Sequence, residues 1–151
     1  MRWLLGAVDL IGHTVVHISG RADYAMRAML VIAAAEPGRV TAPQLAESEQ
    51  MSIGSLQAIL LELRRAGLVI SHRGAERGYG LARPAATITV GDVLRAMDGA
   101  LTTVRGLPTE QATYDGVSRG LRRVWVSVDT AITNVVDQAT LADLLADEVP
   151  A

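Results

Sequence analysis

The stretch Thr41–Leu81, TAPQLAESEQMSIGSLQAILLELRRAGLVISHRGAERGYGL, decides the fold of this chain. Its pattern predicts a short helix, a tight turn, a longer helix and two short strands joined by a tip of arginine and glycine. This order of elements is the outline of a winged helix-turn-helix, in which a β-hairpin wing follows a pair of helices. The first function that the pattern indicates is therefore DNA binding.

Both helices of this stretch begin at recognisable capping residues. Thr41 caps the first, with Gln44 reaching back and Pro43 in the first turn, and this helix is expected to end near Ser48. Ser52 is the expected cap of the second helix. Apolar side chains recur there at helical spacing and predict one buried face: Ile53, Leu56, Ile59, Leu60 and Leu63.

The opposite face of the second helix carries small or amide side chains near its start: Gly54, Ser55, Gln57 and Ala58. Such residues suit a helix in the DNA major groove, because the backbone can approach phosphates while serine and glutamine contact base edges. We therefore expect Ser55 and Gln57 to read bases. Arg64 and Arg65 end the helix, where they either contact phosphates or form a solvated turn favoured by the helix dipole.

The expected wing pairs residues 68–70 with residues 79–81 across the tip at 73–78. A flexible, cationic tip suits insertion of an arginine into a narrow minor groove, where the potential is strongly negative. Arg73 and Arg77 are therefore expected to contact DNA. An arginine–glycine hairpin alone is weak evidence, and it becomes more specific when it follows a helix-turn-helix.

Composition narrows the other functions that the chain could have. Only 3% of the residues are aromatic, so we expect a core of aliphatic side chains in closely packed helices. The chain has no cysteine, which excludes disulfides, thiol redox sensing, thiolate nucleophiles and cysteine-ligated metals. The net charge is −2, yet residues 52–84 hold five arginines and two acids, whereas residues 85–151 hold five arginines and nine acids. The positive charge gathers where the helix-turn-helix pattern lies.

Residues 1–15 fit this organisation least well. Their apolar run is interrupted by Asp9 and is too short for a membrane span, which needs about 20 apolar residues, and no clear signal-peptide cleavage site follows. We expect a dispensable extension, with a short element packed on the body as the alternative. Residues 16–98 then form the DNA-binding domain, beginning with a helix at 21–36, where Ser19 and Arg21 are further candidates for a phosphate contact.

The remainder of the chain predicts a means of dimerisation. Thr89 and Asp92 form a capping box that opens a helix through Met97, residues 99–118 are expected as a long loop, and Thr140 caps a short last helix within 119–151. A longer helix at 121–136 carries an apolar face: Leu121, Val124, Trp125, Val128, Ile132, Val135 and Val136. This face packs either on its own domain or, as we prefer, on a second copy, because helix-turn-helix proteins commonly bind two half-sites as dimers.

Four segments resemble the Rrf2 family of bacterial transcription regulators: HISGRADYAMRAML, LQAILLELRRAGLVISHRG, GYGLARPAATITVGDVLRAMDG and VWVSV. The resemblance covers about His17 to Leu145. It implies a mainly α fold with a small β-wing, a winged helix-turn-helix domain plus a long C-terminal dimerisation helix. It also implies a cytoplasmic homodimer on a pseudo-palindromic operator in double-stranded DNA, usually as a repressor. By position, Ser52, Ser55 and Gln57 fall in the recognition helix, and Arg73 falls at the arginine that enters the minor groove.

Three features depart from the family pattern. Members with an iron–sulfur cluster hold it mainly with cysteines in the loop before the long helix, and TTVRGLPTEQATYDGVSRG has none, so no cluster of the usual kind is expected. The wing sequence RGAERGYGLA replaces the family's usual run of glycines before the tyrosine. Members usually start near the equivalent of Val16. We therefore expect that residues 1–15 result from a translation start assigned upstream of the true one.

Two other classes of function have less support. His13, His17 and His72 are scattered, and neither a paired-carboxylate site nor a glycine phosphate loop appears, so we do not expect an enzyme. The main alternative is a winged-helix adaptor that contacts only proteins, for which binding to DNA with a steep salt dependence would not be seen. The long loop and the cleft beside the dimerisation helix are where we would look for a small-molecule effector, whose chemistry the sequence does not indicate.

Overall fold

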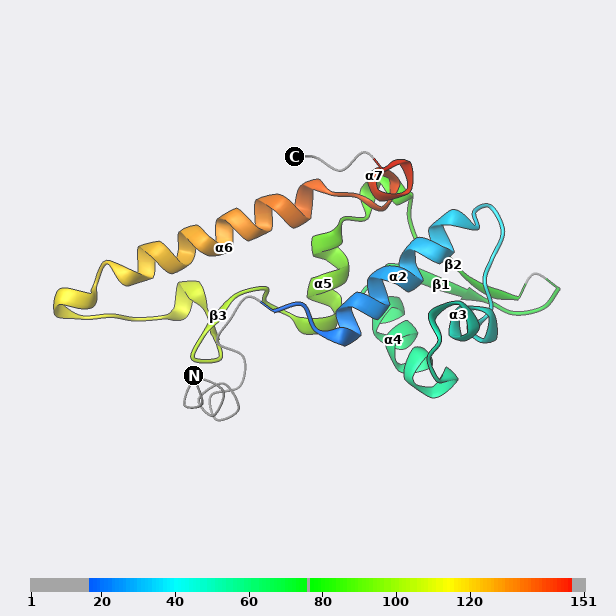
Figure 1. Ribbon diagram of the computed structural model, residues 1–151, viewed down its shortest axis with the longest axis horizontal. Coiled ribbons are helices and arrows are strands. Elements are labelled where there is room, and N and C mark those ends of the chain that lie inside the picture. Colours follow the sequence, from blue (N-terminus) through cyan, green and yellow to red (C-terminus); the bar gives the residue numbers. More distant parts are fainter. Residues whose placement is uncertain (1–16, 76, 148–151) are drawn as a thin grey trace.

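The computed structural model describes residues 17–75 and 77–147. Helices form the body, a β-hairpin projects from one side of it, and a long helix extends from the other side (Figure 1). The helices are α2 (Gly20–Ala34), α3 (Ala42–Glu49), α4 (Ile53–Arg65), α5 (Val90–Asp98), α6 (Leu121–Gln138) and α7 (Leu141–Ala146). The predicted mainly α fold with a small β-wing and a long C-terminal helix is confirmed. The expected extension at residues 1–15 lies outside the described residues.

Local sequence signals account for where these helices begin. Thr41 and Gln44 form the predicted capping box of α3, and Ser52 caps α4 by accepting a hydrogen bond from the backbone nitrogen of Ser55 at 3.2 Å. Thr89 opens α5 and Thr140 opens α7, each in a capping box with the aspartate three residues later. All of these caps were predicted and are confirmed. They could be predicted because each one depends on residues within a single helical turn.

The wing consists of β1 (Val69–His72) and β2 (Gly78–Leu81), paired antiparallel in a register that sets His72 opposite Gly78. Val40, which precedes α3, adds a bridge to Tyr79 through hydrogen bonds of 2.8 and 3.1 Å. A Cβ on Gly78 would lie 2.9 Å from the backbone of Val40, and Gly78 has a φ of +132°. Glycine fits where β2 passes this close to the backbone before α3, and a residue with a side chain would clash there.

An aliphatic core holds the body together, as the composition predicts. It draws on every helix of the body, through fully buried side chains that include Met29, Ile32, Leu45, Leu56, Leu60, Leu63, Val69, Ile88, Val93 and Leu141. Ile53 was expected in this core, and that expectation is wrong, since its side chain is 44% exposed. Residues 52–55 are all exposed because the first turn of α4 extends beyond the body.

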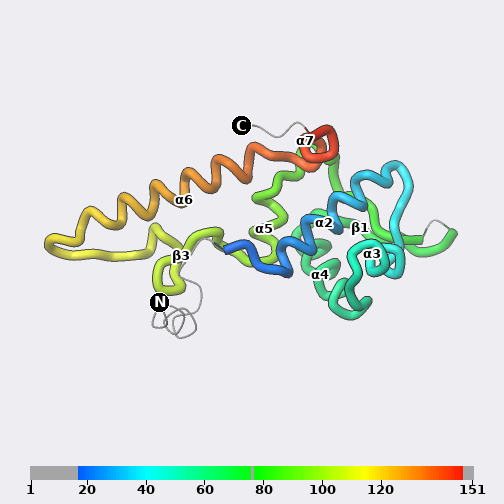
Figure 2. Tube along the Cα trace, viewed as in Figure 1, coloured from blue at the N-terminus to red at the C-terminus, as the bar shows by residue number. Residues whose placement is uncertain are grey.

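The loop at 99–118 has more structure than its sequence predicts. It contains a hairpin of β3 (Thr103–Val104) and β4 (Leu107–Pro108), elements too short to show a periodicity. It then runs alongside α6 (Figure 2), and the guanidinium of Arg122 donates to the carbonyl of Glu110 at 2.9 Å. Of the helices in the described part of the chain, none is long and apolar enough to cross a membrane.

Candidate nucleic-acid interface

The start of α4 presents the side chains that were expected to read bases. Ser55 and Gln57 are both exposed, while Leu56 between them is fully buried and anchors the turn. Ser52 donates its hydroxyl proton to Ser55 Oγ at 2.9 Å, so Ser55 keeps its own proton for another acceptor. A Cβ on Gly54 would meet nothing within 4 Å, which leaves the backbone of this turn open to a close approach. The turn is therefore suited to the floor of a major groove.

A cavity of about 500 Å³ lies between the start of α3, the end of α4 and the hairpin, and is named here the wing groove. Arg64, Arg73 and Arg77 line it, together with Ser71 and His72. Among the described residues that line the wing groove there is no acid. Three guanidinium groups around an open cavity favour an anion, and the repeated phosphates of DNA are the anion that a neighbouring recognition helix would bring.

The arginines of this region differ in how far they are already paired. Arg65 forms an ion pair with Glu62 at 3.0 Å, whereas Arg64 donates to the neutral hydroxyl of Ser71 at 3.2 Å. Within the described ranges 17–75 and 77–147, no ion pair involves Arg64, Arg73 or Arg77. Their positive charge is therefore not neutralised in advance, and each can form a charge-assisted hydrogen bond to a phosphate.

Two further sequence candidates lie at the start of α2, next to the end of α5, whereas the chain leaving the other end of α2 runs to α3 (Figure 1). Ser19 caps this helix and donates its hydroxyl to the carboxylate of Asp98 at 2.7 Å. Arg21 is exposed in the first turn. Because a carboxylate already occupies the Ser19 hydroxyl, its role in the free protein is structural, and a phosphate contact by Ser19 or Arg21 stays a prediction.

Sequence reasoning did not find all of the wing groove. Ser71 and His72 line the wing groove from strand β1. The alternation of side chains along a strand does not show that a cavity lies on one side of it. The ring of His72 is half-buried, and its Nε2 atom has no hydrogen-bond partner among the described residues. The only sequence signal was that both residues directly precede Arg73, and the pairing of the hairpin with residues around Val40 and Thr41 is not visible in the sequence.

The apolar side chains of α6 form two stripes with different environments. Leu121, Val124, Val128 and Val135 recur at spacings of three, four and seven and are 39 to 71% exposed. Trp125 and Ile132 are half-buried on the side of the chain's own loop, where the Trp125 indole donates to the hydroxyl of Tyr114 at 2.9 Å. No residue of α6 is buried. The exposed stripe lacks a covering surface in the described part of this chain.

The chain is similar over most of its length to known transcription regulators. The model of the Rrf2 family, described as iron-dependent transcriptional regulators, matches residues 18–147. A candidate HTH-type transcriptional regulator of Mycobacterium tuberculosis, Rv1287, is 38% identical over 136 residues, which cover 89% of this chain and 84% of that protein. The HTH-type transcriptional regulator CymR of Bacillus subtilis is 31% identical over 84% of this chain and 88% of its own.

Solved structures agree with the sequence comparisons. The structure of CymR, the global cysteine regulator of B. subtilis, matches with a TM-score of 0.74 at 29% identity, covering 88% of this chain and 98% of that one. The structure of IscR from T. potens matches with a TM-score of 0.69 at 34% identity, covering 91% and 90%. The fold and the sequence therefore point to the same group of proteins.

Proposed function

Because this chain belongs to the Rrf2 family and is a DNA-binding transcription regulator, we propose that it binds a palindromic operator as a homodimer and represses the adjacent genes. The observation that carries this proposal is the combination, in one chain, of an exposed polar start of α4 with three unpaired arginines in the wing groove. The start of α4 would lie in a major groove, and the arginines would bind the sugar–phosphate backbone.

In this proposal each element of the interface has a separate task. Gln57 donates and accepts hydrogen bonds at a base edge, for which adenine is the partner with matching geometry, and Ser55 contacts the adjacent base. Arg64 binds phosphates from the wing groove, and Arg65 contributes less because Glu62 already pairs with it. Arg73 enters the minor groove and Arg77 accompanies it, since a cation gains most from the narrow, negative groove.

The homodimer is supported by the exposed stripe of α6. Four aliphatic side chains at heptad-like spacing would lie in water in the monomer, and a second α6 related by a two-fold axis would cover them with the same stripe. Each buried aliphatic side chain adds roughly 1.5 to 3 kcal/mol of hydrophobic stabilisation when it is fully covered. Two recognition helices would then face half-sites one helical turn apart.

The family description names iron, and the donor set of this chain does not fit it. The chain has no cysteine, so thiolate ligands for an iron–sulfur cluster are absent. Across residues 17–75 and 77–147 there is no group of three or more His, Asp or Glu side chains that could hold a metal ion. In and beside the loop at 99–118, Asp129 of α6 accepts a hydrogen bond from Thr102, and Tyr114 accepts one from Trp125. These oxygen atoms therefore already have hydrogen-bond partners. The proposed regulator therefore works without a cluster.

Three related expectations complete the proposal. The protein acts in the cytoplasm by binding alone, without catalysis. A small-molecule effector, if the cell uses one, would act at the loop 99–118 beside α6. The adaptor alternative is not favoured, because the family and the similar proteins are transcription regulators.

The test is selection of genomic DNA fragments by the purified full-length protein, followed by footprinting of the best fragment. We expect a protected palindrome whose half-sites are separated by about one helical turn. Gln57→Ala should alter which fragments are selected, whereas Thr130→Ala, an exposed position on α6 outside the interface, should select the same ones. Failure of the wild-type protein to enrich any sequence even at low salt would overturn the proposal and favour the adaptor.

A further inference from the structure

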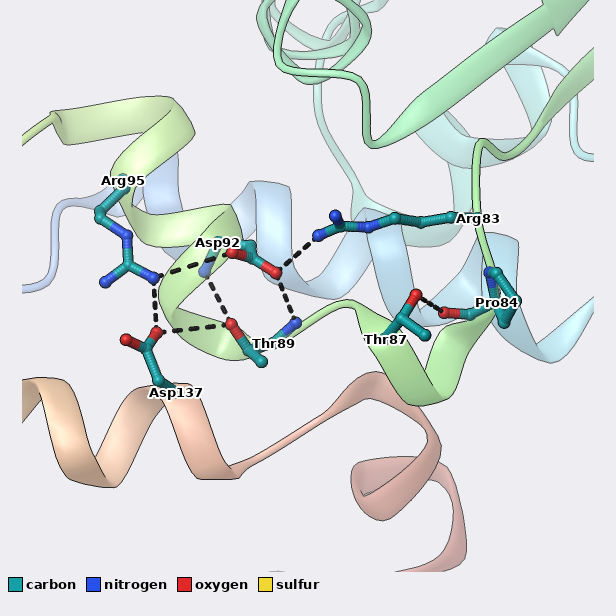
Figure 3. Close-up of polar contacts among 7 residues, drawn as sticks. All are labelled: Arg83, Pro84, Thr87, Thr89, Asp92, Arg95 and Asp137. Carbon is teal, nitrogen blue, oxygen red and sulfur yellow. Dashed lines mark hydrogen bonds and ion pairs between the residues drawn. The ribbon is translucent and has the colours of Figure 1, made fainter.

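Four charged side chains connect the root of the wing to the last turn of α6, and they are named here the bridge: Arg83, Asp92, Arg95 and Asp137 (Figure 3). Arg83, which follows β2, donates to Asp92 Oδ2 at 2.7 Å. Arg95, one turn further along α5, lies 3.7 Å from the other oxygen of Asp92 and donates to Asp137 Oδ1 at 2.5 Å. The bridge thus crosses from the wing through α5 to the long helix.

Asp137 packs closely against the first turn of α5. Gly91 is buried in the first turn of α5, and a Cβ there would collide with Asp137 Oδ1 and lie 2.8 Å from Arg95 Nη2. The carboxylate therefore lies directly over the start of α5, where the helix dipole favours an anion. Thr89, the cap of α5, also approaches Asp137 Oδ1, at 3.5 Å. Glycine at position 91 permits this approach, because a side chain there would displace the Asp137 carboxylate.

The backbone holds the same junction from the other side of Asp137. Val90 donates its N–H to the carbonyl of Ala139 at 2.8 Å, and Leu141 donates to the carbonyl of Ile88 at 2.9 Å. The chain leaving α6 is thereby paired with the chain entering α5. The direction in which α6 leaves the body is set at this end, and small rotations here are amplified along the 18 residues of α6, a length of about 27 Å.

The exposure of the bridge argues that it orients α6 more than it stabilises the fold. The side chains of Arg95 and Asp137 are 38% and 34% exposed, and ion pairs this accessible to water contribute little to folding. The hydrogen bond to Asp137 raises the pKa of Arg95, whose guanidinium is charged at neutral pH in any case. The planar guanidinium of an arginine restricts the orientation of a carboxylate more than the flexible ammonium group of a lysine would.

From this juxtaposition we infer that the bridge, together with Gly91, sets the angle between the dimerisation helix and the DNA-reading elements, and so determines the half-site spacing that the dimer accepts. Asp137 and Arg95 are positioning residues, because they touch neither DNA nor the partner copy in this scheme. Arg83 extends the same constraint to the wing. The inference rests on the proposed homodimer on a palindromic operator.

The test measures affinity for a set of duplexes in which the two half-sites are moved apart or together by one, two and five base pairs. The wild-type protein should lose at least about tenfold in affinity when the spacing changes by two base pairs, which is the effect of a single mismatched base pair or more. Asp137→Ala should lose less than about threefold, with the same affinity as the wild type for an isolated half-site. The matched control is Asp23→Ala, which removes the exposed Asp23–Arg27 pair of α2 and should keep the wild-type profile.

A second measurement reports orientation directly. Because the chain has no cysteine, Ala66→Cys at the exposed end of α4 gives one spin-labelling site per protomer. The distance distribution between the two labels of the free dimer should be narrow in the wild type and broader after Asp137→Ala. Should Asp137→Ala fail to fold, Arg95→Gln removes the same ion pair from the α5 side and decides the question by the same readouts.

The outcomes separate the two proposals. If the wild type binds the palindrome and Asp137→Ala keeps both its spacing profile and its narrow distance distribution, the inference about the bridge is wrong and the proposed function stands. If the wild type binds no duplex of any spacing, the proposed function fails, and the inference fails with it.

Discussion

Substitution of Arg64 tests how the wing groove meets DNA. Arg64 lines the groove, is exposed, and donates only to the neutral hydroxyl of Ser71 at 3.2 Å among the described residues. Arg64→Ala should therefore remove one phosphate contact from each protomer. The slope of log K against log salt changes by about 0.9 per phosphate, so it should become shallower by about 1.8 for the dimer.

This change in slope has a measurable size. Between 50 and 200 mM salt, the affinity of the wild type should fall about twelvefold more than that of Arg64→Ala. The assay is a titration of the selected operator at four salt concentrations within this range, read by fluorescence anisotropy. Arg64→Lys keeps the charge and should restore most of the slope.

Two other arginines serve as controls for Arg64, one beside it in the chain and one in the hairpin of β3 and β4. Arg65→Ala should change the slope less, because Glu62 at 3.0 Å already offsets its charge. Arg105→Ala, in the turn between β3 and β4, should not change it, since that hairpin belongs to the loop beside α6. Equal slopes for the wild type and Arg64→Ala, or a larger change for Arg65→Ala, would refute the assignment of the wing groove to phosphate.

Three other substitutions test separate parts of the structure. Gln57→Ala should weaken operator binding by about 1 to 3 kcal/mol per half-site and relax base preference without altering the salt slope, and titration of operators with single base changes would expose any retained preference. Gly78→Ala should cost about 1 to 3 kcal/mol in the free energy of unfolding, because its Cβ would lie 2.9 Å from the backbone of Val40 at a φ of +132°; an unchanged thermal midpoint would count against this reading. Val128→Glu should yield a monomer in sedimentation, whereas Thr130→Glu, about 200° further around α6, should remain a dimer, and a dimeric Val128→Glu would move the interface elsewhere.

Sequence reasoning succeeded where the determining residues are close together in the chain. The capping boxes at Thr41, Thr89 and Thr140, and the cap at Ser52, each depend on a hydrogen bond across three residues. The apolar period of α4 likewise predicted its buried positions, apart from Ile53. That residue has the right spacing but lies in a turn that extends beyond the body. The sequence of a helix does not show how far the rest of the protein extends along it.

Contacts between distant segments were out of reach from one sequence. In the sequence, Gly91 is an ordinary glycine near a helix start and Asp137 an ordinary acid near a helix end, and only the fold shows that they lie against each other. The same holds for the wing groove, which exists because Val40 pairs with Tyr79 and brings α3 against the hairpin. Such sites depend on contacts between segments that are distant in the sequence, and the local periodicity that predicted the helices gives no information about these contacts.

A net charge of −2 disfavours binding to a polyanion, and the distribution of the charges in the structure explains how one surface of the protein can still bind DNA. Five acids of the C-terminal half have partners among the described residues, which are an arginine, a hydroxyl group or the backbone at a helix cap: Asp92, Asp98, Asp129, Asp137 and Asp143. Their positions in α5, α6 and α7 separate them from the tip of the wing, and at 0.1 M salt exposed charges beyond about 10 Å are largely screened. The arginines of the wing groove therefore dominate the local potential in that groove. The sum over the whole chain mixes the charges of the wing groove with charges on distant elements, so the groove arginines bear more on the partner than the net charge does.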